Sequence, residues 1–165
     1  MDDFNQESSL NKLGGYYGSF SQTPDEPDQF CLLFFDKSNK IGLKGYSLRL
    51  DYSLESPHST LNGLWMSLAN LDATKYSGLD FFIKGSKDKK YPASLKLQLK
   101  NATQTGTYIL NNLDSKWRRV YLPFRDFAGL EDLDHLLKFL IIFEKKEGNP
   151  ETGTVYIDNL QFISR

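Results

Sequence analysis

Turn-forming residues interrupt this sequence so regularly that the apolar segments between them are short. Six interruptions rich in Gly, Pro, Asn or Ser are SNKIG, SPHSTLNG, KGSKDKKYP, NATQTG, NNLDS and KKEGNPETG. Between them, no apolar pattern with the 3.6-residue period of a helix is sustained. Frequent reversals of this kind are typical of sandwiches and barrels built from short strands. The spacing of the turns therefore predicts an all-β chain.

Nine strands are predicted from the apolar or alternating segments between these turns. They cover residues 30–35, 46–52, 64–68, 79–84, 95–100, 107–110, 117–122, 138–143 and 154–162. Composition agrees, because 12 Phe and 9 Tyr favour pleated sheets over helices. A short surface helix is expected within residues 124–137. The predicted architecture is a two-sheet antiparallel β-sandwich, a single domain over residues 1–165, with at most that one helix.

Alternation along the predicted strands separates buried side chains from those that are available to a ligand. In SLKLQLK, for example, the three leucines share one face, and Lys96, Gln98 and Lys100 share the other. KFLIIFE is apolar on both faces, which predicts a central strand. The candidate binding residues that alternation turns outward are Arg49, Asp51, Trp65, Gln98, Lys100 and Tyr121.

The charge balance disfavours two classes of partner. Lys plus Arg number 20 and Asp plus Glu number 21, so no basic excess attracts nucleic acid or an anionic membrane. No apolar stretch of about 18 residues is present to span a bilayer, and the start MDDFNQESS does not resemble a signal peptide. We expect a monomer without nucleic-acid or membrane partners. The compartment stays open, and an extracellular or cell-surface place follows only if the chain is part of a larger secreted protein.

Residues that carry catalysis are sparse. His58 and His135 are the only histidines, Cys31 is the only cysteine, and none of them stands in a nucleophile motif. Cys31 lies in FCLLFF, where a small buried hydrophobe is the simpler interpretation. One Cys and two His without close spacing also provide no zinc ligand set. We therefore expect a protein that is not an enzyme.

Six segments, taken in order and spacing, resemble one group of domains. They are DDFN, NKLGGYYGSF, GYSLRLDY, LDATKYSGLDFFIKG, WRRVYLPFRDF and GTVYIDNLQF. Spanning residues 2–162, they are similar to carbohydrate-binding-module-like jelly rolls of the galactose-binding-domain-like type. Within this group the chain resembles the family-eleven carbohydrate-binding modules and the related domain of an assembly factor of respiratory complex one. The resemblance implies either a sugar binder or an intracellular assembly module.

The resemblance also implies a structural calcium ion that joins the first and last strands. Asp158 in YIDN matches the family's C-terminal acidic position, and Asp3 is a further candidate ligand. Asn5 stands where the family more often has Glu, so one negative charge is absent. Carboxylates, amides and backbone carbonyls from distant loops are the hard oxygen ligands that calcium prefers. Alternatively, Asp158 only caps the last strand through hydrogen bonds to the backbone.

For sugar binding, the resemblance implies the concave outer face of one sheet, where aromatic rings stack on sugar rings and polar side chains bond the hydroxyls. The residues expected to bind carbohydrate are Arg49, Asp51, Trp65, Gln98, Lys100 and Tyr121, with Tyr16 and Tyr17 at the rim. We expect Trp65, Gln98 and Tyr121 to share one accessible hollow. The predicted function is recognition of a neutral oligo- or polysaccharide without bond cleavage. The alternative is a protein-interaction or assembly module on the same fold.

Simpler structural roles stay open for the same residues. Trp65 suits packing under a loop or the short helix as well as a sugar platform. Arg49 suits a surface ion pair with Asp51 or with Asp80. Tyr16 and Tyr17, which stand next to glycines, suit the shaping of a turn. The outer face discriminates between the two functions, because a flat apolar patch above about 400 Å² favours a protein partner over a sugar.

Overall fold

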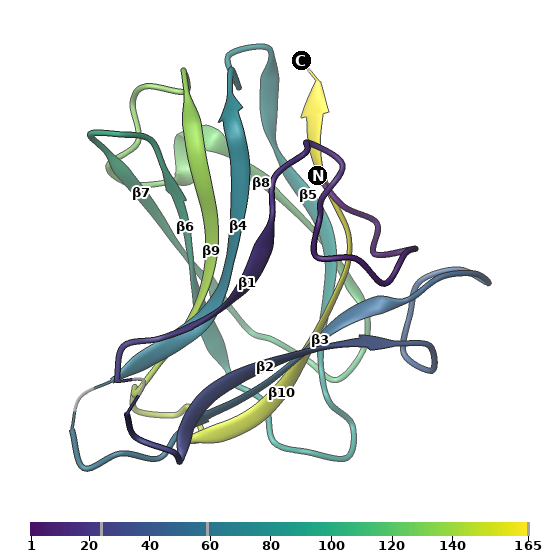
Figure 1. Ribbon diagram of the computed structural model, residues 1–165, viewed down its shortest axis with the longest axis vertical. Helices are drawn as coiled ribbons and strands as arrows, with labels where there is room; N and C mark the ends of the chain where they lie inside the picture. Colours follow the sequence, from purple (N-terminus) through teal and green to yellow (C-terminus); the bar gives the residue numbers. More distant parts are fainter. Residues whose placement is uncertain (24, 59, 165) are drawn as a thin grey trace.

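The computed structural model is a β-sandwich of two five-stranded sheets, and it describes residues 1–23, 25–58 and 60–164 (Figure 1). Within these ranges the strands are β1 (Tyr17–Ser21), β2 (Gln29–Asp36), β3 (Ser47–Leu54), β4 (Leu61–Leu71), β5 (Tyr76–Gly85), β6 (Ser94–Lys100), β7 (Thr105–Asn111), β8 (Arg118–Pro123), β9 (Leu136–Glu144) and β10 (Thr152–Ser164). A single-turn 3-10 helix, η1 (Phe124–Asp126), follows β8. The predicted all-β, two-sheet sandwich is confirmed.

Each sheet is named here after its central strand. The β9 sheet has the order β1-β4-β9-β6-β7, and the β10 sheet has the order β2-β3-β10-β5-β8. All neighbouring strands are antiparallel. The apolar segment KFLIIFE lies in β9, so its predicted central position is confirmed. The two chain ends meet where Asp2 forms a bridge with Leu160 of β10 (Figure 1).

Two local predictions differ from the structure. The predicted strands omit β1, because its sequence YGSFS has few strand-favouring residues and its conformation depends on pairing with β4. The predicted helix shrinks to the three residues of η1, because the chain beyond it is held by β7 through a bridge between Thr107 and Ala128. No helix within the described residues is long and apolar enough to cross a membrane.

The core lies between the inner faces of the two sheets. Its largest fully buried side chains include Phe81, Phe127 and Phe139. Tyr52 of β3 stacks on Phe143 of β9 across the sandwich, with ring centroids 4.1 Å apart and ring planes 6° apart. Such contacts fix the separation of the sheets and leave two outer faces available for binding.

One buried polar side chain also joins the sheets. Asn62 of β4 is fully buried, and its Nδ2 donates hydrogen bonds to the carbonyl oxygens of Phe30, 2.8 Å away, and Ser53, 2.6 Å away. These two acceptors belong to β2 and β3 of the opposite sheet. Asn62 therefore clamps the end of the sandwich where the β9 sheet approaches the edge of the β10 sheet.

Candidate functional site

The predicted carbohydrate-binding residues divide between the outer faces of the two sheets. Trp65, Gln98 and Lys100 belong to the β9 sheet, whereas Arg49, Asp51 and Tyr121 belong to the β10 sheet. The expectation that Trp65, Gln98 and Tyr121 share one hollow is therefore wrong. Alternation orients each side chain relative to its own strand, but the pairing of distant strands decides which sheet carries it.

The outer face of the β9 sheet brings its predicted residues into one cross-strand row. The register places Gly18, Trp65, Leu140, Gln98 and Thr107 opposite one another on β1, β4, β9, β6 and β7. A Cβ atom on Gly18 would lie 3.3 Å from Nε1 of Trp65, so the partly exposed indole lies close against β1. Gln98 Nε2 donates a hydrogen bond to the Thr107 hydroxyl, 3.3 Å away. This row thus joins an aromatic ring to an amide and a hydroxyl.

Two further groups of side chains flank this row. On one side the register aligns Ser67, Lys138, Lys100 and Thr105. Tyr16 precedes β1 on this side, and its carbonyl oxygen accepts a hydrogen bond from the Ser67 amide. The Tyr16 side chain is 63% exposed. On the other side the register aligns Phe20, Gly63, Ile142, Lys96 and Ile109. The face therefore combines apolar surface with hydroxyl and ammonium donors.

Tyr17 lies inside the sandwich and not at a rim. It is 5% exposed, its ring meets Phe4 edge-on with centroids 6.0 Å apart, and its hydroxyl donates to the Ser8 carbonyl oxygen, 2.6 Å away. Burial raises the pKa of Tyr17 above the ordinary tyrosine value. The predicted rim position of Tyr17 is therefore wrong, because alternation within β1 turns Gly18 outward and Tyr17 inward.

Arg49 and Asp51 form a surface ion pair, which is the simpler structural role predicted for them. Their closest side-chain atoms, Nη2 and Oδ2, are 3.5 Å apart on the outer face of β3. The Arg49 guanidinium also lies 4.3 Å from the ring centroid of Phe34. Asp51 accepts a hydrogen bond from the Thr154 hydroxyl, 2.6 Å away, and lies 3.5 Å from Lys89 Nζ. Both side chains are therefore already engaged by neighbouring side chains of the β10 sheet and of the loop that follows β5.

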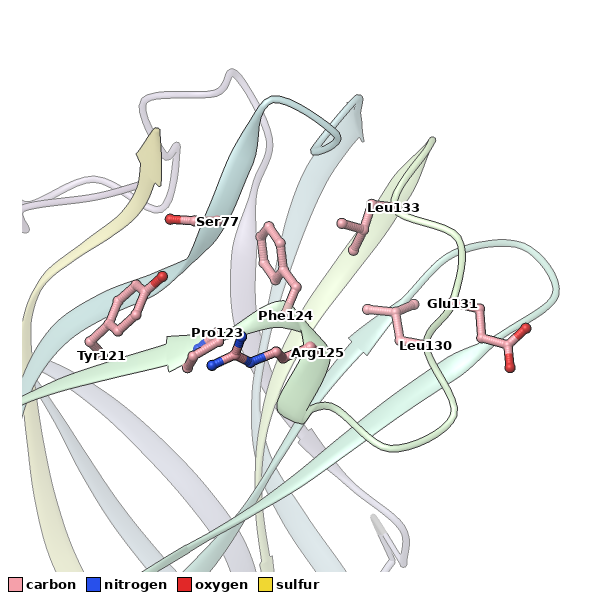
Figure 2. A pocket seen from close by; sticks show the side chains of 8 residues that line it. All are labelled: Ser77, Tyr121, Pro123, Phe124, Arg125, Leu130, Glu131 and Leu133. Atoms are coloured by element: carbon pink, nitrogen blue, oxygen red, sulfur yellow. The ribbon is translucent and has the colours of Figure 1, made fainter. Parts of the chain in front are cut away.

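Tyr121 lies apart from both groups, beside a pocket at one end of the sandwich (Figure 2). The pocket has a volume of about 480 Å³ and is lined by Ser77, Tyr121, Pro123, Phe124, Arg125, Leu130, Glu131 and Leu133. In Figure 2 the Arg125 guanidinium lies on the Tyr121 side, and Glu131 points away from the pocket. Tyr121 therefore belongs to a different surface from Trp65.

The residues predicted to bind calcium come from the two ends of the chain. Asp158 is almost fully buried, and its carboxylate accepts hydrogen bonds from the amides of Ile41, 2.7 Å away, and Asn159, 2.8 Å away. Burial, and to a lesser degree the nearby charge of Asp3, raise the pKa of Asp158. Asp3 pairs with Lys12, and its carboxylate accepts a hydrogen bond from the Asn5 amide. Asp158 therefore makes hydrogen bonds to the backbone, as the alternative role of a strand cap requires.

Two features of the described residues bear on a cation at this place. Within residues 1–23, 25–58 and 60–164, no three His, Cys, Asp or Glu side chains gather as metal ligands. However, in the same described part of the chain, no ion pair with Lys or Arg neutralises Asp158. A buried carboxylate without a cationic partner is costly, and a bound cation offsets that cost. Asp158 is thus the residue on which a calcium hypothesis depends.

The single cysteine is buried in the apolar core. Cys31 is 4% exposed, and burial raises the pKa of its thiol to about 12. A thiol in such a place stays protonated and unreactive. The interpretation of Cys31 as a small hydrophobe is confirmed.

Solved structures that share this fold include several carbohydrate-binding modules. The family 11 module of the cellulosomal cellulase Lic26A-Cel5E of Clostridium thermocellum is similar over 100% of this chain and 93% of its own, with a TM-score of 0.73 and 19% identity. A family 11 module of that organism in complex with a β-1,3-1,4-mixed-linked tetrasaccharide matches over 99% and 94%, with a TM-score of 0.71 and 20% identity. A family 30 module covers 92% of each chain, with a TM-score of 0.63 and 17% identity.

No family model and no curated protein sequence matches the chain. At these identities the structural similarity establishes the fold alone. The expected jelly-roll resemblance is confirmed at that level.

Proposed function

We propose that this chain is a non-catalytic module that binds a neutral oligo- or polysaccharide on the outer face of the β9 sheet. The observation that carries the proposal is the cross-strand row in which Trp65 lies between Gly18 and Leu140 and continues to Gln98 and Thr107. Sugars have apolar C–H faces and polar edges, so an indole beside amide and hydroxyl groups complements both. The binding modules that share the fold support the same ligand class.

The neighbours of this row extend the proposed surface. Lys100 and Lys138 face each other across β6 and β9, and their ammonium groups can donate to sugar hydroxyls. Lys96 is less available, because it forms an ion pair with Glu144 on the same face. Tyr16, which precedes β1 and is 63% exposed, adds a second aromatic ring to the surface beside that of Trp65. Together with Trp65, these residues provide two aromatic contacts and a set of donors for one sugar chain.

Replacing Trp65 by alanine is expected to weaken glycan binding by at least about tenfold, because a central aromatic anchor commonly contributes about 2 kcal/mol. A glycan array that includes β-1,3-1,4-mixed-linked oligosaccharides identifies the ligand, and calorimetric titration then compares the variants. Tyr121→Ala is the matched control on the opposite sheet and should keep the parent affinity. Unchanged binding by Trp65→Ala contradicts the proposed site. A blank array contradicts sugar binding and favours the assembly-module alternative.

We further propose that calcium binds at Asp158, with Asp3 and Asn5 as additional oxygen ligands. A raised pKa means that the folded state binds the Asp158 proton more tightly than the unfolded chain does. Without the metal, stability is therefore lost as the pH rises from the unfolded pKa through the folded pKa. Calcium binds the deprotonated carboxylate and offsets this loss, so its stabilising effect should grow with pH.

We expect millimolar calcium to raise the melting temperature at pH 7, to raise it less at pH 4, and to have no effect on Asp158→Asn. Thermal unfolding followed by circular dichroism, with and without a chelator, measures this difference. Asp72→Asn serves as the control, because Asp72 is exposed and its carboxylate accepts hydrogen bonds from Thr74. An identical melting temperature with calcium and with chelator at pH 7 rules out the calcium proposal.

A further inference from the structure

β2 forms one edge of the β10 sheet and presents large apolar side chains to solvent. Phe30, Leu32 and Phe34 are 37%, 47% and 40% exposed, and they share the outer face of this eight-residue strand. The register between β2 and β3 is unbroken, so the strand is regular along its length. On its other side, β2 pairs with no strand of the described chain. The strand therefore combines an open sheet edge with an apolar surface.

The other three edge strands carry features that hinder edge-to-edge pairing. β1 has only five residues, including a glycine and two serines. The free side of β7 is covered by Ala128, whose backbone exchanges two hydrogen bonds with Thr107. β8 carries two arginines and ends at Pro123. Short length, covering segments, charges and proline are the usual protections of an edge. β2, with the sequence QFCLLFFD, is eight residues long, has no proline and carries its only charge, Asp36, at its end.

An acidic hollow lies beside this apolar row on the outer face. It has a volume of about 640 Å³, and Phe30 and Leu32 form part of its wall. The charged residues that line it are Asp28, Asp51, Glu55, Asp88, Lys89 and Lys90. Asp51 is engaged by Arg49 and Lys89, whereas the other three carboxylates form no ion pair within the described residues. Acidic groups thus outnumber basic ones, and the unpaired groups favour a basic ligand.

We propose that β2 is a docking edge for an extended, basic segment of a partner protein, which adds to the β10 sheet as a further strand. Backbone hydrogen bonds along the edge hold such a segment, and its apolar side chains cover Leu32 and Phe34. Its Lys or Arg side chains lay their aliphatic stems along Phe30 and carry their charges to the carboxylates of Asp28 and Glu55.

A second copy of this chain fits the same edge less well. If β2 pairs with itself antiparallel about Leu32, Asp28 of one copy lies opposite Asp36 of the other. Like charges directly opposite each other destabilise a strand pair. The edge is also separate from the proposed sugar surface, because Trp65 belongs to the other sheet. A partner segment and a glycan can therefore bind at the same time, and the two proposals stand or fall independently.

The test uses the full 165-residue chain and two peptides as long as β2, one of alternating Lys and Val and one of alternating Glu and Val. We expect the Lys-Val peptide to bind at least about tenfold more tightly in a fluorescence anisotropy titration, with an affinity that falls as salt rises. Leu32→Lys places a charge on the edge and should weaken binding at least about tenfold. Leu43→Lys adds the same charge at a 97% exposed loop residue and should keep the parent affinity.

A second variant removes negative charge from the hollow beside β2. Asp28→Asn combined with Glu55→Gln should reduce the salt dependence of peptide binding, and it should leave the melting temperature unchanged because both side chains are exposed. Trp65→Ala should bind the peptide as the parent does. Equal affinity for the two peptides, or unchanged binding by Leu32→Lys at the parent melting temperature, overturns the proposal. A sedimentation mass that changes from dimer to monomer on Leu32→Lys also overturns it and identifies a second copy as the occupant.

Discussion

Replacing Phe143 by alanine is expected to lower the free energy of unfolding by about 3–5 kcal/mol, which is the range for deleting a large buried aromatic side chain. Phe143 is 2% exposed and stacks on Tyr52 of the opposite sheet. The substitution removes that stacking and leaves a cavity between the sheets, where the surrounding strands relax only in part. Since domains of this size are stable by about 5–15 kcal/mol, the variant should retain only part of its stability.

Urea denaturation followed by tryptophan fluorescence and circular dichroism measures this loss. Leu137→Ala on the same strand is the matched control, because Leu137 is 37% exposed and should cost about 1 kcal/mol or less. Both variants should keep the slope of the unfolding free energy against urea concentration, which reports the surface exposed on unfolding. Equal losses in the two variants contradict a core organised around the Tyr52–Phe143 stack.

The sequence predicts the orientation of side chains well within single strands. In β6, the leucines are buried and Gln98 and Lys100 are partly exposed, as the alternation in SLKLQLK indicates. This success is local in origin, because the two-residue period of a strand is fixed by its backbone. Which of the two sheets a strand joins depends instead on its pairing with strands that are distant along the chain. Trp65 and Tyr121 both alternate outward, yet their strands pair with different partners in different sheets.

The candidate sugar surface shows the same limit. Trp65 and Gln98 are foreseen separately, but the row between them requires the order β1-β4-β9-β6-β7, which no local pattern encodes. Leu140 completes the row because β9 lies between β4 and β6, although KFLIIFE indicates only that its strand is central. Tyr17 shows the reverse case. Its strand is short and rich in Gly and Ser, so the alternation that buries it is not evident from the sequence.

Asn62 is the residue whose structural role is least evident from the sequence, because a polar side chain at the start of a strand ordinarily faces solvent. Its acceptors are the carbonyl groups of Phe30 and Ser53, and Phe30 is distant along the chain. Only the packing of the two sheets brings them together. The amide is therefore a tertiary feature, and its contribution to stability can be tested directly.

Replacing Asn62 by alanine is expected to lower the free energy of unfolding by about 2–4 kcal/mol, because two carbonyl groups lose their donor at a buried position and each such loss costs about 1–3 kcal/mol. A second variant, Asn62→Asp, tests whether stability depends on the hydrogen bonds of Asn62 or only on the volume of its side chain. Aspartate has nearly the same shape, but its carboxylate meets two carbonyl oxygens with acceptors in place of a donor, so Asn62→Asp should be less stable than Asn62→Ala. Asn111→Ala, at an exposed position of β7, is the control and should change stability by about 0.5 kcal/mol or less. If urea denaturation shows aspartate tolerated as well as alanine, then Asn62 fills space and does not clamp the sheets.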